Sequence, residues 1–195
     1  GVPIYTDGSC KHVEDPVIAV AACAAVQFRS DGSIATVTIA VPRSFHRSAV
    51  VSEHMAVVIA CIANRDGVRL DIFSDCQAVV SGFNTSKDVA LNYKRNMAGF
   101  WVQTSVNLAS ISRVKAHLTR KQAEDLGQAQ HHRGNELADF IADQALPLYN
   151  HDELEGYLKG KSRRTATVTG TMDTLIAHAN AAPSLDMLQE EQDFP

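Results

Sequence analysis

Four carboxylates stand next to apolar segments, where a charged side chain is unusual. Asp7 follows a strand-like apolar run, and Glu53 lies in the first turn of a mostly apolar helical segment. Asp75 ends a second short apolar run, and Asp139 lies within a later helical segment. Carboxylates beside buried elements are rarely left unpaired, because desolvating them is costly. These acids are therefore candidate ligands for a hard cation such as Mg²⁺.

Each acid taken alone also has a purely structural interpretation. Asp7 could shape a turn with Gly8, and Asp75 could cap the helix that follows it. Glu53 could favour a helix N-terminus through the helix dipole, and Asp139 could be a solvated surface residue. A chemical role depends on whether the four acids meet, and the elements that carry them decide this.

The pattern of apolar residues predicts three strands followed by alternating helices and strands. Alternating and continuous apolar runs predict strands, and Asp31-Gly32 predicts a hairpin turn between the second and third. Val51, Met55 and Val58 recur at helical spacing. The expected strands are 2–6, 17–28, 34–41, 69–74 and 110–115, and the expected helices are 48–64, 75–83, 92–108 and 133–146.

This order predicts an α/β fold with a five-stranded mixed sheet, in which three antiparallel strands are followed by parallel additions and flanked by helices. The first and fourth strands can then be neighbours, which places Asp7 and Asp75 at one sheet edge with the helix of Glu53 above them. Like charges this close repel each other unless cations neutralise them. Two Mg²⁺ ions about 4 Å apart are the usual device for phosphoryl displacement by water. The spacing therefore favours a metal-dependent phosphoryl-transfer site.

Composition excludes several other classes of protein. The 195 residues are 45% hydrophobic and 21% charged, which is typical of a globular domain rather than a disordered or fibrous chain. No apolar stretch is long enough to span a bilayer, so we expect no membrane segment. Nucleic-acid-binding proteins are more often basic, whereas this chain has a net charge of −4. Acids that bind metal ions also make the net charge more negative, so its sign does not decide. Four cysteines without a CxxC pair predict no zinc site and a reducing intracellular location, cytoplasmic or nuclear rather than secreted.

Five segments together resemble the signatures of the ribonuclease H family. They occur in the family's order, on the expected elements and over about residues 2–146. One such segment would be weak evidence for the family, but five in order are a specific signal. They are Thr6-Asp7-Gly8-Ser9-Cys10, Ser52-Glu53, Ser74-Asp75-Cys76-Gln77-Ala78-Val79-Val80, Val114-Lys115-Ala116-His117 and Gly134-Asn135-Glu136-Leu137-Ala138-Asp139. Their residue patterns resemble those of ribonuclease H domains in retroelement reverse transcriptases more than those of stand-alone cellular enzymes. The resemblance implies a ribonuclease H-like fold, an RNA–DNA hybrid as substrate and a covalently linked reverse transcriptase domain as partner.

The resemblance also implies a role for each acid. Asp7, Glu53, Asp75 and Asp139 would hold two Mg²⁺ ions, for which Mn²⁺ could substitute, with Asp7 bridging the two. Hydrolysis of the RNA strand would leave 5′-phosphate and 3′-hydroxyl ends. His117 would assist proton transfer or product release, since an unperturbed imidazole titrates near neutral pH.

The connection after His117 departs from the family pattern. It is much shorter in most members, whereas here residues 118–133 contain an insertion with two further histidines, His131 and His132. Either of them could act in place of His117, which also has an ordinary interpretation as a polar loop residue. His117 is preferred because its Lys-Ala-His context matches the family.

A ribonuclease H must distinguish RNA from DNA through the 2′-hydroxyl of the RNA strand. The candidate contacts are backbone groups, one side-chain amide in the third signature and one in the fourth. Two segments depart from the family in ways that affect substrate contacts: residues 11–16 replace a stretch rich in Gly and Asn, and residues 48–51 carry no Asn or Gln ahead of the helix acid. The candidate substrate-binding residues are Gly8, Ser9, Cys10, Gln77 and Asn135.

The sequence predicts a domain boundary near residue 147. Residues 1–147 form the expected ribonuclease H domain, and residues 148–195 are expected to be a largely irregular tail or linker with a short helix at 173–180. The basic run from Lys159 to Arg164 could contact phosphates, or be a solvated linker. The first residue is Gly1 rather than Met, which leads us to expect a piece of a longer polypeptide.

Two rival functions remain open from the sequence. The first is a catalytically silent ribonuclease H-like domain that binds nucleic acid, and the presence of all four acids argues against it. The second is an integrase-like enzyme that transfers DNA strands, and the Thr-Asp-Gly-Ser start argues against that one. Hybrid cleavage is therefore the favoured hypothesis.

Overall fold

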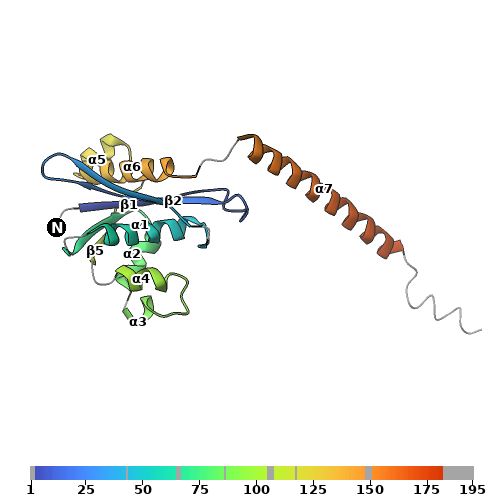
Figure 1. The fold of residues 1–195 in the computed structure, drawn as a ribbon, viewed down its shortest axis with the longest axis horizontal. Helices are drawn as coiled ribbons and strands as arrows, with labels where there is room; N and C mark the ends of the chain where they lie inside the picture. Colours follow the sequence, from blue (N-terminus) through green and yellow to red (C-terminus); the bar gives the residue numbers. More distant parts are fainter. Residues whose placement is uncertain are drawn as a thin grey trace, which may run out of the picture. The chain divides into compact units, whose positions relative to one another are not determined.

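The protein is described by a computed structural model over residues 3–42, 44–64, 67–85, 87–104, 108–116, 118–147 and 151–181. Within these ranges five strands form one sheet in the order β3-β2-β1-β4-β5 (Figure 1). The first three strands pair antiparallel, whereas β1, β4 and β5 pair parallel. The strands are β1 (Pro3–Lys11), β2 (Val20–Phe28), β3 (Ile34–Ala40), β4 (Leu70–Ser74) and β5 (Leu108–Arg113). The predicted mixed sheet is confirmed, including the first and fourth strands as neighbours.

Helices cover both faces of this sheet, α1 on one and α6 on the other (Figure 1). Successive residues of a strand point to opposite faces, so Ile4 of β1 packs against α1 while Tyr5 packs against α6. Residue 5 is fully buried in the second of these layers. The helices of this part of the chain are α1 (Ala49–Ala63), α2 (Gln77–Asn84), α3 (Lys87–Ala90), α4 (Ala98–Thr104), α5 (Arg120–Asp125) and α6 (Ala129–Gln144).

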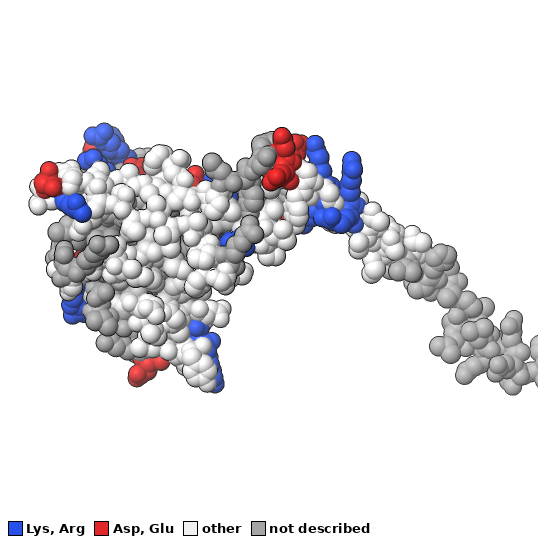
Figure 2. All heavy atoms as spheres, in the orientation of Figure 1, with Lys and Arg blue, Asp and Glu red and all other residues white. Residues whose placement is uncertain are grey.

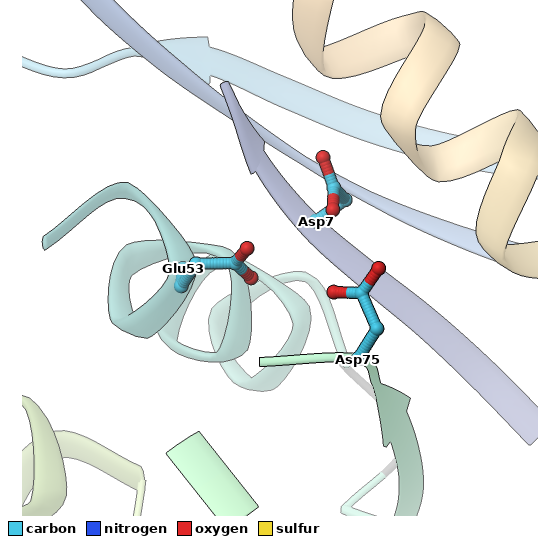
Figure 3. Close-up of side chains that lie close together, drawn as sticks. All are labelled: Asp7, Glu53 and Asp75. Atoms are coloured by element: carbon cyan, nitrogen blue, oxygen red, sulfur yellow. The ribbon is translucent and has the colours of Figure 1, made fainter. Parts of the chain in front are cut away.

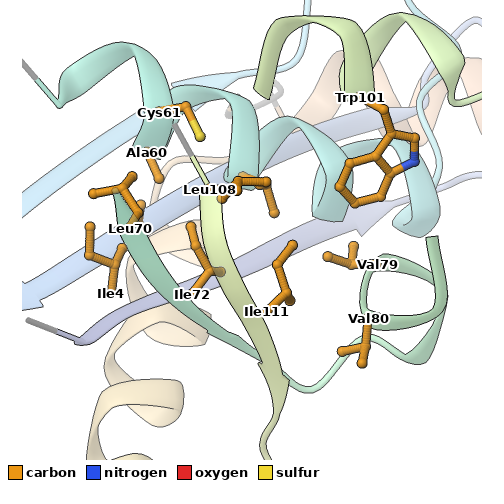
Figure 4. Close-up of a cluster of buried hydrophobic side chains, with 12 residues drawn as sticks. Ile4, Ala60, Cys61, Leu70, Ile72, Val79, Val80, Trp101, Leu108 and Ile111 are labelled. Atoms are coloured by element: carbon orange, nitrogen blue, oxygen red, sulfur yellow. The ribbon is translucent and has the colours of Figure 1, made fainter. Parts of the chain in front are cut away.

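The main hydrophobic core lies between the sheet and the layer of α1, α2 and α4 (Figure 4). Ile72 of β4 and Leu108 of β5 are almost fully buried at its centre, and Trp101 of α4 closes one side. Burial of a large apolar side chain stabilises a fold by about 1.5–3 kcal/mol, so this cluster holds α4 against the sheet.

Two helical predictions were wrong in detail. The helix expected over 92–108 is shorter in the structure, where α4 covers only Ala98–Thr104. Asn92 forms a local turn ahead of it, in which its Oδ1 accepts the Lys94 amide at 3.0 Å. The insertion after residue 117 also contains a helix that was not predicted, α5. Its start is fixed by a capping box between Thr119 and Gln122.

The central feature for the site is the difference in length between β1 and β4. β1 pairs with β2 from Ile4 to Lys11, but its pairing with β4 ends at Tyr5. Beyond Ser74 the chain leaves the sheet and turns into α2. The second half of β1 therefore has an open edge on its β4 side, inside the sheet rather than at its border.

Residues 148–195 form a second compact unit, separate from residues 1–147. The expectation of a largely irregular tail was wrong, because His151–Ala181 forms one helix, α7. Acids in its first turn suit the helix dipole, and Lys159 forms an ion pair with Glu155 one turn earlier at 2.7 Å. Three threonine hydroxyls inside the helix donate to carbonyls one turn back. The sequence does not predict this long helix, because it is polar and its apolar residues do not recur strongly at helical spacing.

Charged atoms of α7 gather near its beginning, where acidic atoms are followed by basic ones (Figure 2). The later part of the described helix is mostly uncharged in this view. A search of the described residues finds no helix with the length and apolar character needed to cross a membrane.

Candidate metal centre

Three carboxylates meet at the open edge of β1 (Figure 3). Asp7 lies on β1 two residues after the last pairing with β4, and Asp75 lies directly after the end of β4. Glu53 reaches them from α1, and one oxygen of each acid lies within 4.8 Å of the others. The three side chains come from separate elements and point toward one another.

The structural alternatives for these three acids do not hold. Asp7 lies inside β1 rather than in a turn. The N-cap of α2 is Cys76, not Asp75. Glu53 is the fifth residue of α1, so the prediction that it lies in the first turn was wrong: it lies at the start of the second turn. The helix begins at Ala49 because Ser48 caps it, with its hydroxyl accepting the Val51 amide at 3.4 Å.

Gly8 allows α1 to approach β1 closely enough for Glu53 to enter the centre. A Cβ at residue 8 would lie 2.4 Å from the backbone nitrogen of Glu53 and 2.5 Å from the carbonyl carbon of Ser52. Backbone atoms cannot move aside without displacing the helix. Gly8 therefore has a positioning role in addition to the substrate contact that the resemblance implies.

Gly134 has a matching role on the other face of the sheet. A Cβ there would lie 2.3 Å from Cδ2 of the buried Tyr5 ring, so α6 can lie against β1 only with glycine at this position. The next residue, Asn135, donates from Nδ2 to Asp75 Oδ2 at 3.0 Å. Sequence reasoning missed the contact between Gly134 and Tyr5. The available signal was a glycine inside a helical pattern, which often has a packing reason.

Burial and mutual repulsion raise the pKa values of two of the acids. The pKa of Asp7 rises to about 7, first through desolvation and then through the charges of Asp75 and Asp139. The pKa of Glu53 rises to about 9, through desolvation first and then the charges of Asp7 and Asp75, although a hydrogen bond from the Gly8 backbone opposes the rise. Without a counter-ion, the centre therefore holds protons at neutral pH.

Asp139 lies on the border of the centre rather than inside it. It is exposed on α6 and stands outside the group of carboxylate oxygens that lie within 4.8 Å of one another. Its charge nevertheless contributes to the raised pKa values of Asp7 and Glu53. The structure thus brings three of the four predicted acids into direct proximity and keeps the fourth within electrostatic reach.

The donor set fits a hard divalent cation. Glu53 Oε2 is buried and has no hydrogen-bond partner among the described residues, although a carboxylate oxygen buried alone is costly. The three acids offer only oxygen ligands, which suit Mg²⁺ or Mn²⁺ better than a soft metal. A divalent ion would supply both the missing partner and the missing positive charge.

The three candidate histidines have different surroundings. His117 lies outside the described residues. The strand before it ends near the centre, where the Val114 amide donates to the Ser74 carbonyl at 2.9 Å. His131 stacks on Phe73 with ring centroids 4.3 Å apart, and its Nδ1 lies 3.2 Å from the Tyr5 hydroxyl. Residue 132 is buried, with its Nε2 3.4 Å from a carboxylate oxygen of residue 136. Both later histidines are thus engaged in packing.

The residues considered for substrate binding have different surroundings, and Asn135 contacts an acid of the centre directly. Ser9 donates to Asp143 Oδ1 at 3.2 Å, and Cys10 is a half-buried free thiol. Gln77 is exposed in the first turn of α2, and its amide donates to Ser81 Oγ at 2.8 Å. Asn135 Oδ1 is buried and has no partner among the described residues, while its amide nitrogen holds Asp75.

The sheet order and the cluster of carboxylates at its open edge define a ribonuclease H-like α/β fold. The family model for RNase H matches residues 1–147, and the chain belongs to the ribonuclease H family. A comparison with curated proteins finds no match.

Solved structures show the same fold. The native prototype foamy virus protease–reverse transcriptase is similar with a TM-score of 0.57 and 20% identity over 76% of this chain and 21% of that chain. A foamy viral protease–reverse transcriptase in complex with an RNA/DNA hybrid gives 0.55 and 21%, over 74% of this chain and 20% of that chain. The solution structure of the PFV RNase H domain gives 0.55 and 20%, over 74% and 93%. The chain thus spans about a fifth of the length of the first two and most of the third.

Proposed function

We propose that this protein is an endoribonuclease that hydrolyses the RNA strand of RNA–DNA hybrids with the help of two divalent metal ions. The observation that carries the proposal is the meeting of three carboxylates at the open edge of β1, with one buried oxygen unpartnered in the described structure. Membership of the ribonuclease H family supports nuclease activity as the use of this centre.

In this proposal, Asp7, Glu53, Asp75 and Asp139 hold the ions, Mg²⁺ with Mn²⁺ as a substitute. The bound ions supply an activated water and neutralise the charge that develops on the leaving 3′ oxygen. Asn135 fixes the orientation of the Asp75 carboxylate through its amide. Fixing a ligand in this way through a neighbouring hydrogen bond is common in metal sites.

The remaining candidate residues act on the substrate. His117 accepts or donates a proton near the cleaved bond or assists product release. Backbone groups of Gly8, Ser9 and Cys10, with the exposed amide of Gln77, recognise the 2′-hydroxyl of the RNA strand. Their position beside Asp7 and Asp75 along the chain supports this assignment.

The proposal extends to the parent protein. We infer that the domain works as part of a longer reverse transcriptase polypeptide inside the cell. The support is that two structural neighbours are protease–reverse transcriptase chains of which this chain spans about a fifth. Co-purification of polymerase activity with the natural form of the protein tests the linkage, and a natural form that consists of these residues alone contradicts it.

A cleavage assay tests the function directly. The full chain is incubated with end-labelled RNA as a hybrid with DNA, as a single strand, and with labelled duplex DNA, in each case with Mg²⁺ or with EDTA. We expect cutting of the hybrid RNA in Mg²⁺ only, with 5′-phosphate and 3′-hydroxyl ends. The Asp75→Asn variant keeps the shape of the side chain but not its charge, so it should fold and fail to cut.

Two outcomes of the same assay contradict the proposal. Cutting or joining of duplex DNA without cutting of the hybrid indicates an integrase-like enzyme. Tight binding of the hybrid without cutting at any Mg²⁺ or Mn²⁺ concentration indicates a silent binding module. Retained turnover in Asp75→Asn overturns the role given to that residue.

A further inference from the structure

Two rows of polar side chains face each other beyond the carboxylate centre, one on β1 and one on α6. Alternate residues of β1 from Asp7 to Lys11 point to the α6 face of the sheet. Every fourth residue of α6 from Asn135 to Asp143 lies on one face of that helix. The contacts show that these faces meet, because Ser9 Oγ donates to Asp143 Oδ1 at 3.2 Å.

Lys11 ends the β1 row and forms an ion pair across to α6. Its Nζ lies 2.9 Å from Asp143 Oδ1, the same oxygen that accepts from Ser9. These two contacts hold the pKa of Asp143 below its ordinary value, so this acid is charged at neutral pH. The pair therefore places a positive charge on the same strand face as Asp7, four residues further along β1.

This ion pair is weak enough to exchange partners. The side chains of Lys11 and Asp143 are 55% and 45% exposed, and water screens the attraction between such groups. The flexible side chain of Lys11 can thus exchange the carboxylate for a phosphate with little loss of interaction free energy. Asp143 holds the ammonium group beside α6 in the structure.

The position of Lys11 suits a polyanion that runs through the centre. Four residues of extended strand span about 13 Å, so a nucleic-acid strand with a phosphate at Asp7 comes near Lys11 within a few nucleotides. On the face of unit 1 in view, described basic atoms form small separate groups rather than one broad patch (Figure 2). The net charge of −4 does not attract a polyanion as a whole, so phosphate contacts need local cations.

We propose that Lys11 is a substrate-binding residue that contacts a backbone phosphate a few nucleotides from the cleavage point. In the free protein, Asp143 pairs with Lys11 and holds it in position. When the substrate binds, its phosphate takes the place of the Asp143 carboxylate. The inference rests on the proposed function, because it needs a nucleic-acid strand at the carboxylate centre.

Binding measurements on the full chain test this contact. Fluorescence anisotropy gives the Kd for an RNA–DNA hybrid as a function of salt, in the Asp75→Asn background so that the hybrid stays intact. Lys11→Ala should weaken binding about tenfold, the loss of one charge-assisted contact. It should also reduce the slope of log K against log salt by about one. Lys11→Arg should restore both values.

The Asp143→Asn variant separates the proposal from a merely structural ion pair. Removal of the Asp143 carboxylate should lower the Kd for the hybrid about twofold. If the ion pair were merely structural, Lys11→Ala and Asp143→Asn should change the Kd in the same direction. Lys121→Ala on α5, which also removes an exposed positive charge, is the matched control and should leave the salt slope within error. Thermal unfolding of each variant checks that the fold is kept.

Cleavage by the corresponding variants with Asp75 restored gives a second measurement. Lys11→Ala should raise KM about tenfold and leave kcat within about a factor of two. The proposal is overturned if Lys11→Ala leaves Kd and the salt slope unchanged, or if both variants weaken binding alike. Absence of cleavage in the wild type would contradict the proposed function alone, since the Kd values come from a variant that does not cut.

Discussion

The carboxylate centre and the connection from Val114 to Gln128 belong to one site by family resemblance, yet they are built differently. The acids of the centre lie on or directly beside regular elements, and two close glycine contacts hold those elements in place. The connection contains an insertion, which has its own short helix and its own cap. The positions of the acids therefore depend on long-range pairing of strands, whereas the position of the histidine depends on a local segment.

The inserted segment is nevertheless well fixed where it is described. The amide of Thr119 donates to Gln122 Oε1 at 2.9 Å, which with the reciprocal hydroxyl contact closes the cap of α5. Ala123 is fully buried, and α5 packs on α6. The cap and the packing on α6 hold the described part of the insertion in place.

The largest effect is expected from loss of the central acid. Asp7→Asn should lower cleavage by more than about a hundredfold, the upper range for groups that merely orient metal ligands. Steady-state cleavage of the hybrid measures the change. The control is Asp125→Asn on the inserted helix, which removes an exposed charge and should change activity by less than about twofold. Equal losses in both variants would contradict the distinction between centre and insertion.

Substitution of His117 and of His131 should change different properties of the protein, the first its activity and the second its stability. His117→Ala should lower kcat by about a hundredfold, as expected for loss of a general acid or base. His131→Ala should leave kcat nearly unchanged and lower the Tm, because this ring packs on Phe73 and Tyr5. Cleavage rates and thermal unfolding of both variants decide the matter. A large loss of kcat in His131→Ala alone would move the catalytic role to the later histidine.

A smaller effect is expected from the glycine that holds α6 against β1. Gly134→Ala places a methyl group against the Tyr5 ring and should destabilise the fold by about 1–3 kcal/mol. Cleavage should fall as well, because Asn135 and Asp139 shift with the helix. Gly99→Ala on α4 meets open space, so it should be neutral or slightly stabilising. Denaturant unfolding compares them, and equal stability of the two variants would contradict the packing argument.

An effect on stability that needs no substitution is expected from pH when no metal is bound. The folded pKa values of Asp7 and Glu53, about 7 and about 9, lie above their ordinary values, so the folded state binds more protons than the unfolded one. Stability is then greatest below about pH 4 for these groups and falls as pH rises toward 9. In EDTA the Tm should drop by more than about 10 °C between pH 5 and pH 8. Glu53→Gln should flatten this drop, and a steeper drop in that variant would contradict the account.

Much of the fold and of the centre could be predicted because each motif lies at the end or on the face of a strongly patterned element. The apolar run before Asp7 and the one before Asp75 define neighbouring strands, so their meeting follows from the topology. The helix of Glu53 was predicted to start within one residue of its observed start, but Glu53 itself lies in the second turn of that helix and not in the first.

Other features depend on contacts that a single sequence does not show. The close packing of Gly134 on Tyr5 joins residues far apart in the chain. The ion pair of Lys11 with Asp143 needs both the strand register and the helix phase to be known. The helix α5 and the part of α7 before residue 173 escaped prediction because their sequences are polar, and local caps and ion pairs rather than an apolar stripe stabilise them.

Calorimetric titration of Mg²⁺ into the metal-free protein at pH 7.5 tests the central claim most directly. Glu53, with its pKa raised to about 9, holds a proton at this pH and must lose it to bind a cation. Titrations in two buffers of different ionisation enthalpy should therefore show Mg²⁺ binding that releases about one proton, and less in Glu53→Gln. No binding at millimolar Mg²⁺, or binding without proton release, would contradict a buried carboxylate centre that requires divalent counter-ions.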